Sequence, residues 1–185
     1  MRIVVPMLEL GQPAPDFLLD GVDGSKHSLA SFADSPFLVV IFSCNHCPYV
    51  KAYEDRMVAI QRDYQAKGVR LVAINSNDEV SYPEDDFAHM VVRAKEKGFN
   101  FPYLRDAAQS AAGAYGGVCT PHVFAFDSAR RLRYRGRIDD SRDPSNVTTH
   151  DLRNALDDLV SGAAVRTSDT MSFGCSIKWL SAKAV

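Results

Sequence analysis

The sequence predicts an α/β fold of three layers, with a mixed central sheet between helices. Apolar runs typical of strands buried on both faces alternate along the chain with segments of helical periodicity. Two further extended segments are joined by a short turn, so they are expected to pair antiparallel and to make the sheet mixed. With 46% hydrophobic and 24% charged residues, the composition is that of an ordinary globular protein.

The first part of the chain predicts a hairpin followed by a β-α-β unit. Extended runs at 17–20 and 25–29 flank the turn residues 21–24. Residues 37–42 and 69–74 are continuous apolar runs, expected as parallel strands with a right-handed crossover. The crossover helix is expected to end before Gly68, and its apolar face comprises Val50, Tyr53, Met57, Ile60 and Tyr64.

The second part of the chain predicts more helices and strands. The motif Ser81-Tyr82-Pro83-Glu84 has the pattern of a capping box with an early proline, which favours a helix beginning there. Asp106 is expected to cap the helix that follows it. The expected helices cover 83–98, 107–115 and Thr148 or Thr149 to Gly162, and the expected strands cover 101–104, 122–126 and 131–135.

No repeat, low-complexity tract or linker divides the chain of 185 residues, a length that suits one domain with an appendage. Residues 1–162 are expected to form one domain that includes the N-terminal hairpin. Residues 163–185 have no clear periodicity and are expected to form a C-terminal tail that docks on the same domain.

Charge and hydropathy exclude several classes of partner. The chain has 21 basic and 23 acidic residues, a net charge of −2, whereas nucleic acids and anionic membranes bind concentrated positive charge. No apolar stretch approaches the ~20 residues that cross a bilayer. The N-terminal residues 1–10 are interrupted by Pro6 and lack the apolar core of a signal peptide. We expect a cytoplasmic protein.

Two of the four cysteines, Cys44 and Cys47, lie where the first buried strand meets the long helix. The amino end of a helix favours a thiolate, and the thiolate is the nucleophile in disulfide exchange. The spacer Asn45-His46 allows the two sulfurs to form a reversible disulfide. Pro48 suits the first helical turn, where a missing N–H costs little.

Three interpretations compete for this pair: redox chemistry, half of a zinc site, and buried structural thiols. A zinc site needs two more ligands, and the sequence contains no second CxxC or CxxH motif. A close cysteine pair at a strand–helix junction favours redox chemistry. We therefore expect neither a metal nor a cofactor.

Several motifs together resemble the thioredoxin-fold superfamily, in its AhpC/TSA-like or peroxiredoxin-like branch. They extend from residue 11 to residue 179 and comprise Gly11-Gln12-Pro13-Ala14-Pro15-Asp16-Phe17, Phe42-Ser43-Cys44-Asn45-His46-Cys47-Pro48-Tyr49, Cys119-Thr120-Pro121, Tyr134 to Arg142, and Gly174-Cys175-Ser176-Ile177-Lys178-Trp179. The resemblance implies a thioredoxin fold with an N-terminal hairpin and an inserted helix. It also implies that the Thr120–Pro121 bond is cis beside the cysteine pair and that Thr120 contacts the substrate.

His46 occupies the third motif position, as in strongly oxidising Cys-Pro-His-Cys proteins, so it is expected to stabilise a Cys44 thiolate and to make the pair more oxidising. A solvent-facing histidine with no electronic role is the alternative. Thioredoxins carry a buried acid in the strand before the motif, and residues 38–42 contain none. The group that deprotonates Cys47 is therefore not identified from sequence.

The expected function is thiol–disulfide oxidoreduction, in which Cys44 attacks and Cys47 resolves the mixed disulfide. Substrates would be protein or low-molecular-weight thiols and disulfides, with a cellular thiol as reductant. A peroxiredoxin-like peroxidase is the alternative, although the sequence lacks the peroxiredoxin motif Pro-x-x-x-Thr-x-x-Cys. With Cys47 as the motif cysteine, Val40 and Cys44 stand at the Pro and Thr positions. With Cys44 as the motif cysteine, Phe37 and Ile41 stand there. A non-catalytic redox-sensing or metal-binding module is a third hypothesis.

The other two cysteines have open roles. Cys119 is either an auxiliary thiol near Pro121 or a small apolar core residue. Cys175 is either a third thiol that shuttles electrons to the pair or part of a segment that docks the tail. The charged segment 135–143 is expected to be a solvated strand end and loop.

Overall fold

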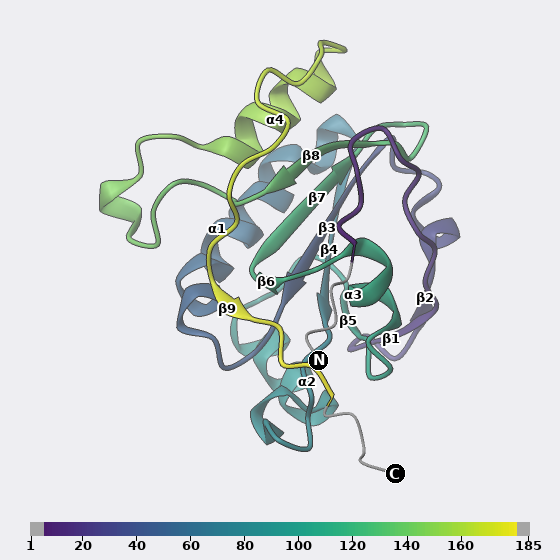
Figure 1. Ribbon diagram of the computed structural model, residues 1–185, viewed down its shortest axis with the longest axis vertical. Coiled ribbons are helices and arrows are strands. Elements are labelled where there is room, and N and C mark those ends of the chain that lie inside the picture. The colour runs from purple at the N-terminus through teal and green to yellow at the C-terminus, as the bar shows by residue number, and fades with distance from the viewer. Residues whose placement is uncertain (1–5, 181–185) are drawn as a thin grey trace.

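The computed structural model describes residues 6–180, in which the expected mixed sheet is present (Figure 1). Within that range seven strands follow the order β2-β1-β5-β4-β3-β7-β8. Their bounds are β1 Leu19–Gly21, β2 Lys26–His27, β3 Phe37–Ser43, β4 Val69–Asn75, β5 Tyr103–Arg105, β7 His122–Phe126 and β8 Leu132–Gly136. The helices are α1 Pro48–Tyr64, α2 Phe87–Glu96, α3 Ser110–Tyr115 and α4 Asp151–Val160.

Strand β3 is the centre of the sheet. It pairs parallel with β4 on one side and antiparallel with β7 on the other, while β8 pairs antiparallel with β7. The predicted β-α-β unit and the later antiparallel pair are both confirmed, as is the hairpin of β1 and β2, which pairs with β5 at one end of the sheet. The carboxyl end of β3 therefore lies between two neighbours that hold it in place.

Two apolar cores lie on opposite faces of the sheet. Val39 and Ile41 of β3 pack with residues of α1, α2 and α4, whereas Leu38, Val40 and Phe42 pack with α3 and the N-terminal segment. All five side chains are fully buried. Alternation along a strand directs successive side chains to opposite faces, so the continuous apolar run serves both cores at once.

The helix predicted from the 81–84 motif begins later than expected. A 3-10 turn covers Pro83–Asp85, and α2 begins after Asp86, whose carboxylate accepts a hydrogen bond from the His89 backbone N–H at 2.8 Å. Asp86, the last residue of the acidic run 84–86, is the N-cap because its side chain reaches the third helical N–H. This shift leaves the carboxylate of Asp85 free to point into the protein.

The helix predicted over 107–115 is shorter, because Gln109 adopts a left-handed backbone conformation with φ of 59°. Asp106 still satisfies the helix start from outside: its carboxylate accepts from the Ala112 backbone N–H at 2.9 Å. None of the helices within 6–180 combines the length and the apolar character needed to cross a bilayer.

The C-terminal segment runs back along the domain after α4 (Figure 1). Arg135 of β8 exchanges backbone hydrogen bonds with Ser168 and Thr170. Further on, strand β9 (Cys175–Ser176) pairs antiparallel with β6 (Cys119–Thr120) as a separate two-stranded sheet. The chain's last described residues are thereby brought to the carboxyl end of β3.

The charged segment 135–143 is not the solvated loop that the sequence suggested. Asp139 is only 2% exposed, and the Nη1 atom of Arg56 in α1 donates to both of its carboxylate oxygens at 2.8 and 2.7 Å. Arg56 also donates to backbone carbonyls of Ser141 and Arg142. A buried carboxylate needs such a partner, so this contact ties α1 to the loop after β8.

We predict that Arg56→Met lowers the free energy of unfolding by about 3 kcal/mol, because it leaves Asp139 as a buried charge without its partner. Urea denaturation measures the change. Lys26→Met is the matched control, since the Lys26–Asp20 pair is more than half exposed at both ends and should cost less than about 1 kcal/mol. Equal costs for the two variants would contradict the prediction.

Candidate active site

The sequence-predicted site residues meet at the carboxyl end of β3. The strand ends at Ser43, and Cys47 is the N-cap of α1, with Pro48 at its first position. Cys44, Asn45 and His46 therefore form the turn between the central strand and the helix. The predicted strand–loop–helix context of the CxxC motif is confirmed.

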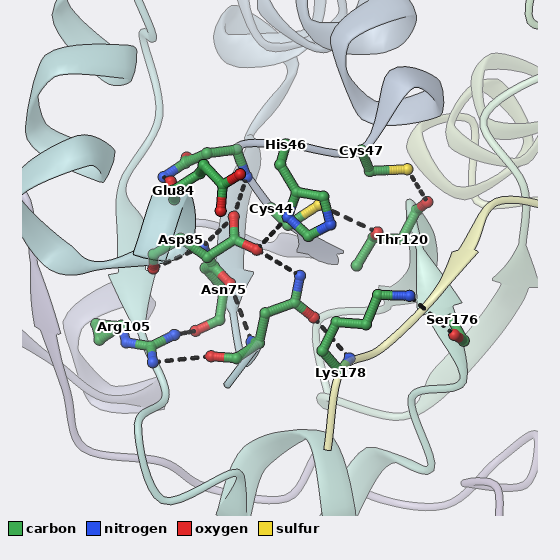
Figure 2. Close-up of polar contacts among 12 residues, drawn as sticks. Cys44, His46, Cys47, Asn75, Glu84, Asp85, Arg105, Thr120, Ser176 and Lys178 are labelled. Carbon is green, nitrogen blue, oxygen red and sulfur yellow. Dashed lines mark hydrogen bonds and ion pairs between the residues drawn. The ribbon is translucent and has the colours of Figure 1, made fainter. Parts of the chain in front are cut away.

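Thr120 lies beside both sulfurs (Figure 2). The Thr120–Pro121 bond is cis, as expected. The Thr120 hydroxyl is 3.3 Å from the Sγ atom of Cys44. Its carbonyl oxygen is 3.5 Å from the Sγ atom of Cys47 and accepts a hydrogen bond when that thiol is protonated. One residue of β6 thus contacts both members of the pair.

The pair is enclosed by protein. All four cysteines are free thiols, and Cys44 and Cys47 are only 1% and 0% exposed. Their small apolar cluster includes Val50 of α1, with Tyr49 and Cys175 packed against it. A large partner therefore has little direct access to either sulfur in this conformation.

The surroundings shift the pKa values of the two thiols in opposite directions. A hydrogen bond from the Cys44 thiol lowers the pKa of Cys47 to about 4, and backbone N–H of Val50 at the start of α1 contributes. The neighbouring Cys47 thiolate, burial and the negative charge of Asp85 raise the pKa of Cys44 well above its ordinary value. These directions favour a thiolate on Cys47, the N-cap of α1, and the Cys44 thiolate expected from the sequence stays a prediction.

His46 contacts a carboxylate instead of a sulfur. Its Nδ1 atom is 2.5 Å from the Oδ2 atom of Asp85, and its ring stacks on Tyr82 at 5.2 Å between centroids. Among the residues that the structure describes, no hydrogen bond joins His46 to Cys44. A ring nitrogen of His46 nevertheless lies within 4.8 Å of the Cys44 sulfur, so the electrostatic effect of His46 on Cys44 stays a prediction.

Asp85 supplies the buried acid that β3 lacks, from a different part of the chain. Its carboxylate is fully buried and accepts from the Asn45 backbone N–H at 2.6 Å and from the Asn77 side-chain amide at 2.7 Å (Figure 2). Sequence reasoning missed it, because the acidic run 84–86 also fits the start of a helix. Only the fold shows which of these acids points inward.

Asn45 anchors the turn between the cysteines. Its side-chain amide donates to the backbone carbonyl of Glu84 at 2.8 Å, and its side-chain oxygen accepts from the Tyr103 hydroxyl at 2.9 Å. With the backbone contact to Asp85, three hydrogen bonds fix this residue. These hydrogen bonds fix the turn that carries Cys44 to within 3.3 Å of the Thr120 hydroxyl.

Cys119 and Cys175 lie in the paired strands β6 and β9 but differ in environment. Cys119 is 7% exposed, and burial raises its pKa, as for a thiol in a core position. Cys175 is half-buried, is the strand partner of Thr120, and contacts Cys47. Cys175, and not Cys119, packs against the cluster of Cys44, Cys47 and Val50, so the structure places Cys175 beside the pair.

One group of side chains has the donor types that a metal ion takes. The donor atoms of Cys44, His46 and Asp85 all lie within 4.8 Å of one another. Thiolate, imidazole and carboxylate are all zinc ligands. The sequence predicted no metal site, because these residues are not at the spacing of a known zinc motif.

Comparison with known proteins is decisive at the level of the family. The AhpC/TSA family profile matches residues 10–135, which is more than half of the chain. The chain belongs to the AhpC/TSA family. It has the thioredoxin fold that the sequence resemblance implied. Individual relatives support the same family and fold.

The chain is similar to a solved hypothetical protein of Sinorhizobium meliloti 1021, with 42% identity, a TM-score of 0.90, and coverage of 96% of this chain and 98% of that one. A thioredoxin family thiol:disulfide interchange protein from Chlorobium tepidum TLS shares the fold, with 24% identity, a TM-score of 0.57 and coverage of 68% and 84%. The thiol-disulfide oxidoreductase ResA of Geobacillus thermodenitrificans is 25% identical over 126 residues, 67% of each chain.

We predict that the reduced protein retains thiolate absorbance near 240 nm at about pH 6, far below the range in which a free thiol ionises. Acid titration should remove this absorbance as Cys47 is protonated. In Cys44→Ser we expect the titration midpoint of Cys47 to rise but to stay below that of a free thiol, because a serine hydroxyl replaces the Cys44 thiol that lowers the pKa of Cys47. Retention of the signal in Cys47→Ser would contradict the assignment of the charge.

Proposed function

We propose that this protein is a thiol–disulfide oxidoreductase whose Cys44–Cys47 pair cycles between dithiol and disulfide. The observation that carries the proposal is the arrangement of the two sulfurs: Cys44 and Cys47 lie in one buried cluster at the turn between β3 and the amino end of α1. Thr120 of β6 contacts both sulfurs, Cys44 through its hydroxyl and Cys47 through its carbonyl oxygen. This geometry suits reversible formation of one S–S bond.

In the reaction, a substrate disulfide gains two electrons and two protons while Cys44 and Cys47 lose them and become bonded to each other. The reverse reaction oxidises a substrate dithiol. Stabilisation of the Cys47 thiolate favours the reduced pair, so it makes the disulfide a stronger oxidant. We therefore propose that the pair accepts electrons from substrate thiols more readily than an ordinary disulfide does.

The partners we propose are protein or low-molecular-weight thiols and disulfides, with a cellular thiol as the reductant. The similarity to ResA supports this substrate class in general terms. We also propose a cytoplasmic setting, where thiols are kept reduced and a close cysteine pair serves catalysis better than structure. In such a compartment the Cys44–Cys47 disulfide would exist only transiently.

Asp85 and His46 accept the proton that Cys44 must lose when the disulfide forms. The carboxylate and the imidazole share a hydrogen bond of 2.5 Å, and their donor atoms lie within 4.8 Å of the Cys44 sulfur. Proton acceptors at such sites accelerate reactions by about 10²-fold or more. Asp85 also holds the Cys44 pKa up, which keeps the proton on Cys44 until exchange begins.

We predict that Asp85→Asn slows formation of the Cys44–Cys47 disulfide by about 10²-fold at neutral pH and shifts the pH profile, because the acceptor and its charge are removed. Stopped-flow oxidation at a series of pH values measures both effects. Asp86→Asn is the control, since asparagine also caps helices. An Asp85→Asn profile that coincides with this control would refute the role of Asp85.

A competition experiment tests the proposed function itself. The reduced protein is mixed with a model peptide disulfide in one arm and hydrogen peroxide in the other, and thiols are mapped by alkylation and mass spectrometry. We expect oxidation by the disulfide to give a Cys44–Cys47 bond, with peroxide reacting no faster than with a free thiol. Fast peroxide oxidation through a Cys47 sulfenic acid would favour a peroxidase, despite Cys44 at its threonine position.

The cluster of Cys44, His46 and Asp85 supports metal binding as a second candidate function. Zinc bound there would compete with redox chemistry, because formation of the Cys44–Cys47 disulfide removes the thiolate ligand. Stoichiometric zinc in the purified reduced protein, lost in Asp85→Asn, would favour this candidate. A pair that oxidises equally fast with and without added zinc would exclude it.

A further inference from the structure

The buried cysteine pair needs a route to external thiols. Cys44 and Cys47 are 1% and 0% exposed, so a bulky thiol cannot reach a disulfide between them in this conformation. Of the four cysteines, all within the described residues, Cys175 is the one with partial exposure. A thiol at the surface that also contacts the buried pair would supply the missing connection.

The C-terminal strand places Cys175 against Cys47. Cys175 is the register partner of Thr120 in the antiparallel pairing of β9 with β6. Thr120 in turn contacts the sulfurs of both Cys44 and Cys47. Cys175 packs against the apolar cluster of Cys44, Cys47 and Val50, and its thiol helps to lower the pKa of Cys47. Three thiols are thus arranged around one residue.

This arrangement is built into the tail and does not depend on a single contact. Lys178 lies close to the site (Figure 2), and its backbone makes hydrogen bonds of 2.9 Å with the Asn77 side chain and 2.8 Å with the Asp78 backbone. Ile177 is 3% exposed in the core beside α3. Gly174 permits the close approach, because a Cβ atom there would lie 2.1 Å from the Thr120 carbonyl oxygen. The tail therefore fixes Cys175 from both sides.

We propose that Cys175 is a third redox thiol, which exchanges with the Cys44–Cys47 disulfide to form a Cys47–Cys175 bond and so presents a disulfide to external thiols. The proposal rests on the proposed function, since it starts from the oxidised pair. Its substrate class is a thiol small or flexible enough to reach a half-buried sulfur, such as glutathione or a cysteine in an extended peptide.

Each step balances. The Cys175 sulfur, losing its proton, attacks Cys47; the Cys44–Cys47 bond breaks, the Cys47–Cys175 bond forms, and Cys44 takes up a proton. An external thiolate then attacks Cys175 and releases the Cys47 thiolate. A second external thiol attacks the mixed disulfide at the external sulfur and frees Cys175. In sum, two external thiols become one disulfide, and the Cys44–Cys47 disulfide becomes two thiols.

The order of the steps follows from the environment of Cys47. In the reduced protein the Cys47 thiolate raises the pKa of Cys175 to about 11, after the larger effect of burial, so Cys175 is then a poor nucleophile. When Cys47 is in a disulfide that charge is gone, so the pKa of Cys175 falls toward the value that burial alone gives it and Cys175 becomes a better nucleophile. Cys47 is also the better leaving group when an external thiol attacks Cys175, because acidic thiols leave faster.

The first test traps the proposed bond. Cys44→Ser is oxidised with excess oxidised glutathione, alkylated in acid and mapped by mass spectrometry. We expect a Cys47–Cys175 disulfide as the main product, and the same product in Cys44→Ser/Cys119→Ser. A Cys47–glutathione adduct or a Cys47–Cys119 bond as the main product would overturn the proposal.

The second test measures whether reduction of the Cys44–Cys47 disulfide passes through Cys175. The wild type, Cys175→Ser and Cys119→Ser are oxidised, and reduction of the Cys44–Cys47 bond by glutathione is followed in stopped flow. We expect Cys175→Ser to react more slowly by about tenfold or more, because the intramolecular step is lost, and Cys119→Ser to match the wild type. Reduction of Cys175→Ser at the wild-type rate would overturn the proposal.

These outcomes are separable from failure of the proposed function. If the wild type forms a Cys44–Cys47 disulfide but Cys175→Ser is reduced at the same rate, only the role of Cys175 is wrong. If the wild type forms no such disulfide with any oxidant, the proposed function fails first. Circular dichroism of each variant shows that the fold is retained.

A third variant tests the placement of the strand without removing a thiol. Gly174→Ala adds a Cβ atom that would collide with the Thr120 carbonyl and displace β9 from β6. We expect the yield of the Cys47–Cys175 bond in the Cys44→Ser background to fall severalfold. Gly113→Ala is the control, since a Cβ atom there meets nothing within 4 Å. Equal yields from both variants would contradict the proposed role of the strand pairing.

Discussion

The contacts of Thr120 are the constraint on which the rest of the site depends. Its hydroxyl and its carbonyl reach the two sulfurs of the CxxC motif, and its backbone pairs with the C-terminal strand. These contacts require β6 to lie against the carboxyl end of β3, which the antiparallel pairing of β7 with β3 ensures. The sheet order is therefore what brings residues from three distant parts of the chain to one point.

The charges of the site follow from this placement. The cysteine neighbour and the amino end of α1 favour a thiolate at Cys47, while a buried carboxylate, Asp85, opposes ionisation of that neighbour. The two effects move the pKa values of Cys44 and Cys47 apart. A dithiol with one thiolate and one thiol is ready both to attack a disulfide and to donate a proton.

Periodicity and motif spacing predicted the β-α-β unit, the hairpin, the mixed sheet and the position of the CxxC turn, because these depend on local patterns of apolar residues. The inward direction of Asp85 could not be predicted, since an acidic run before a helix looks the same whether its members cap the helix or are buried. The low pKa of Cys47 was also missed: it depends on which cysteine is the N-cap. The pairing of Cys175 with Thr120 is a long-range contact that no local pattern encodes.

The reduction potential of the Cys44–Cys47 pair tests the central claim most directly. The protein is equilibrated in glutathione redox buffers, quenched in acid, and the pair is quantified by mass mapping. The account predicts a two-electron Cys44–Cys47 couple that is more oxidising than the thioredoxin couple at about −270 mV, because the reduced form is stabilised. A couple more reducing than thioredoxin, or no disulfide at all, would contradict it.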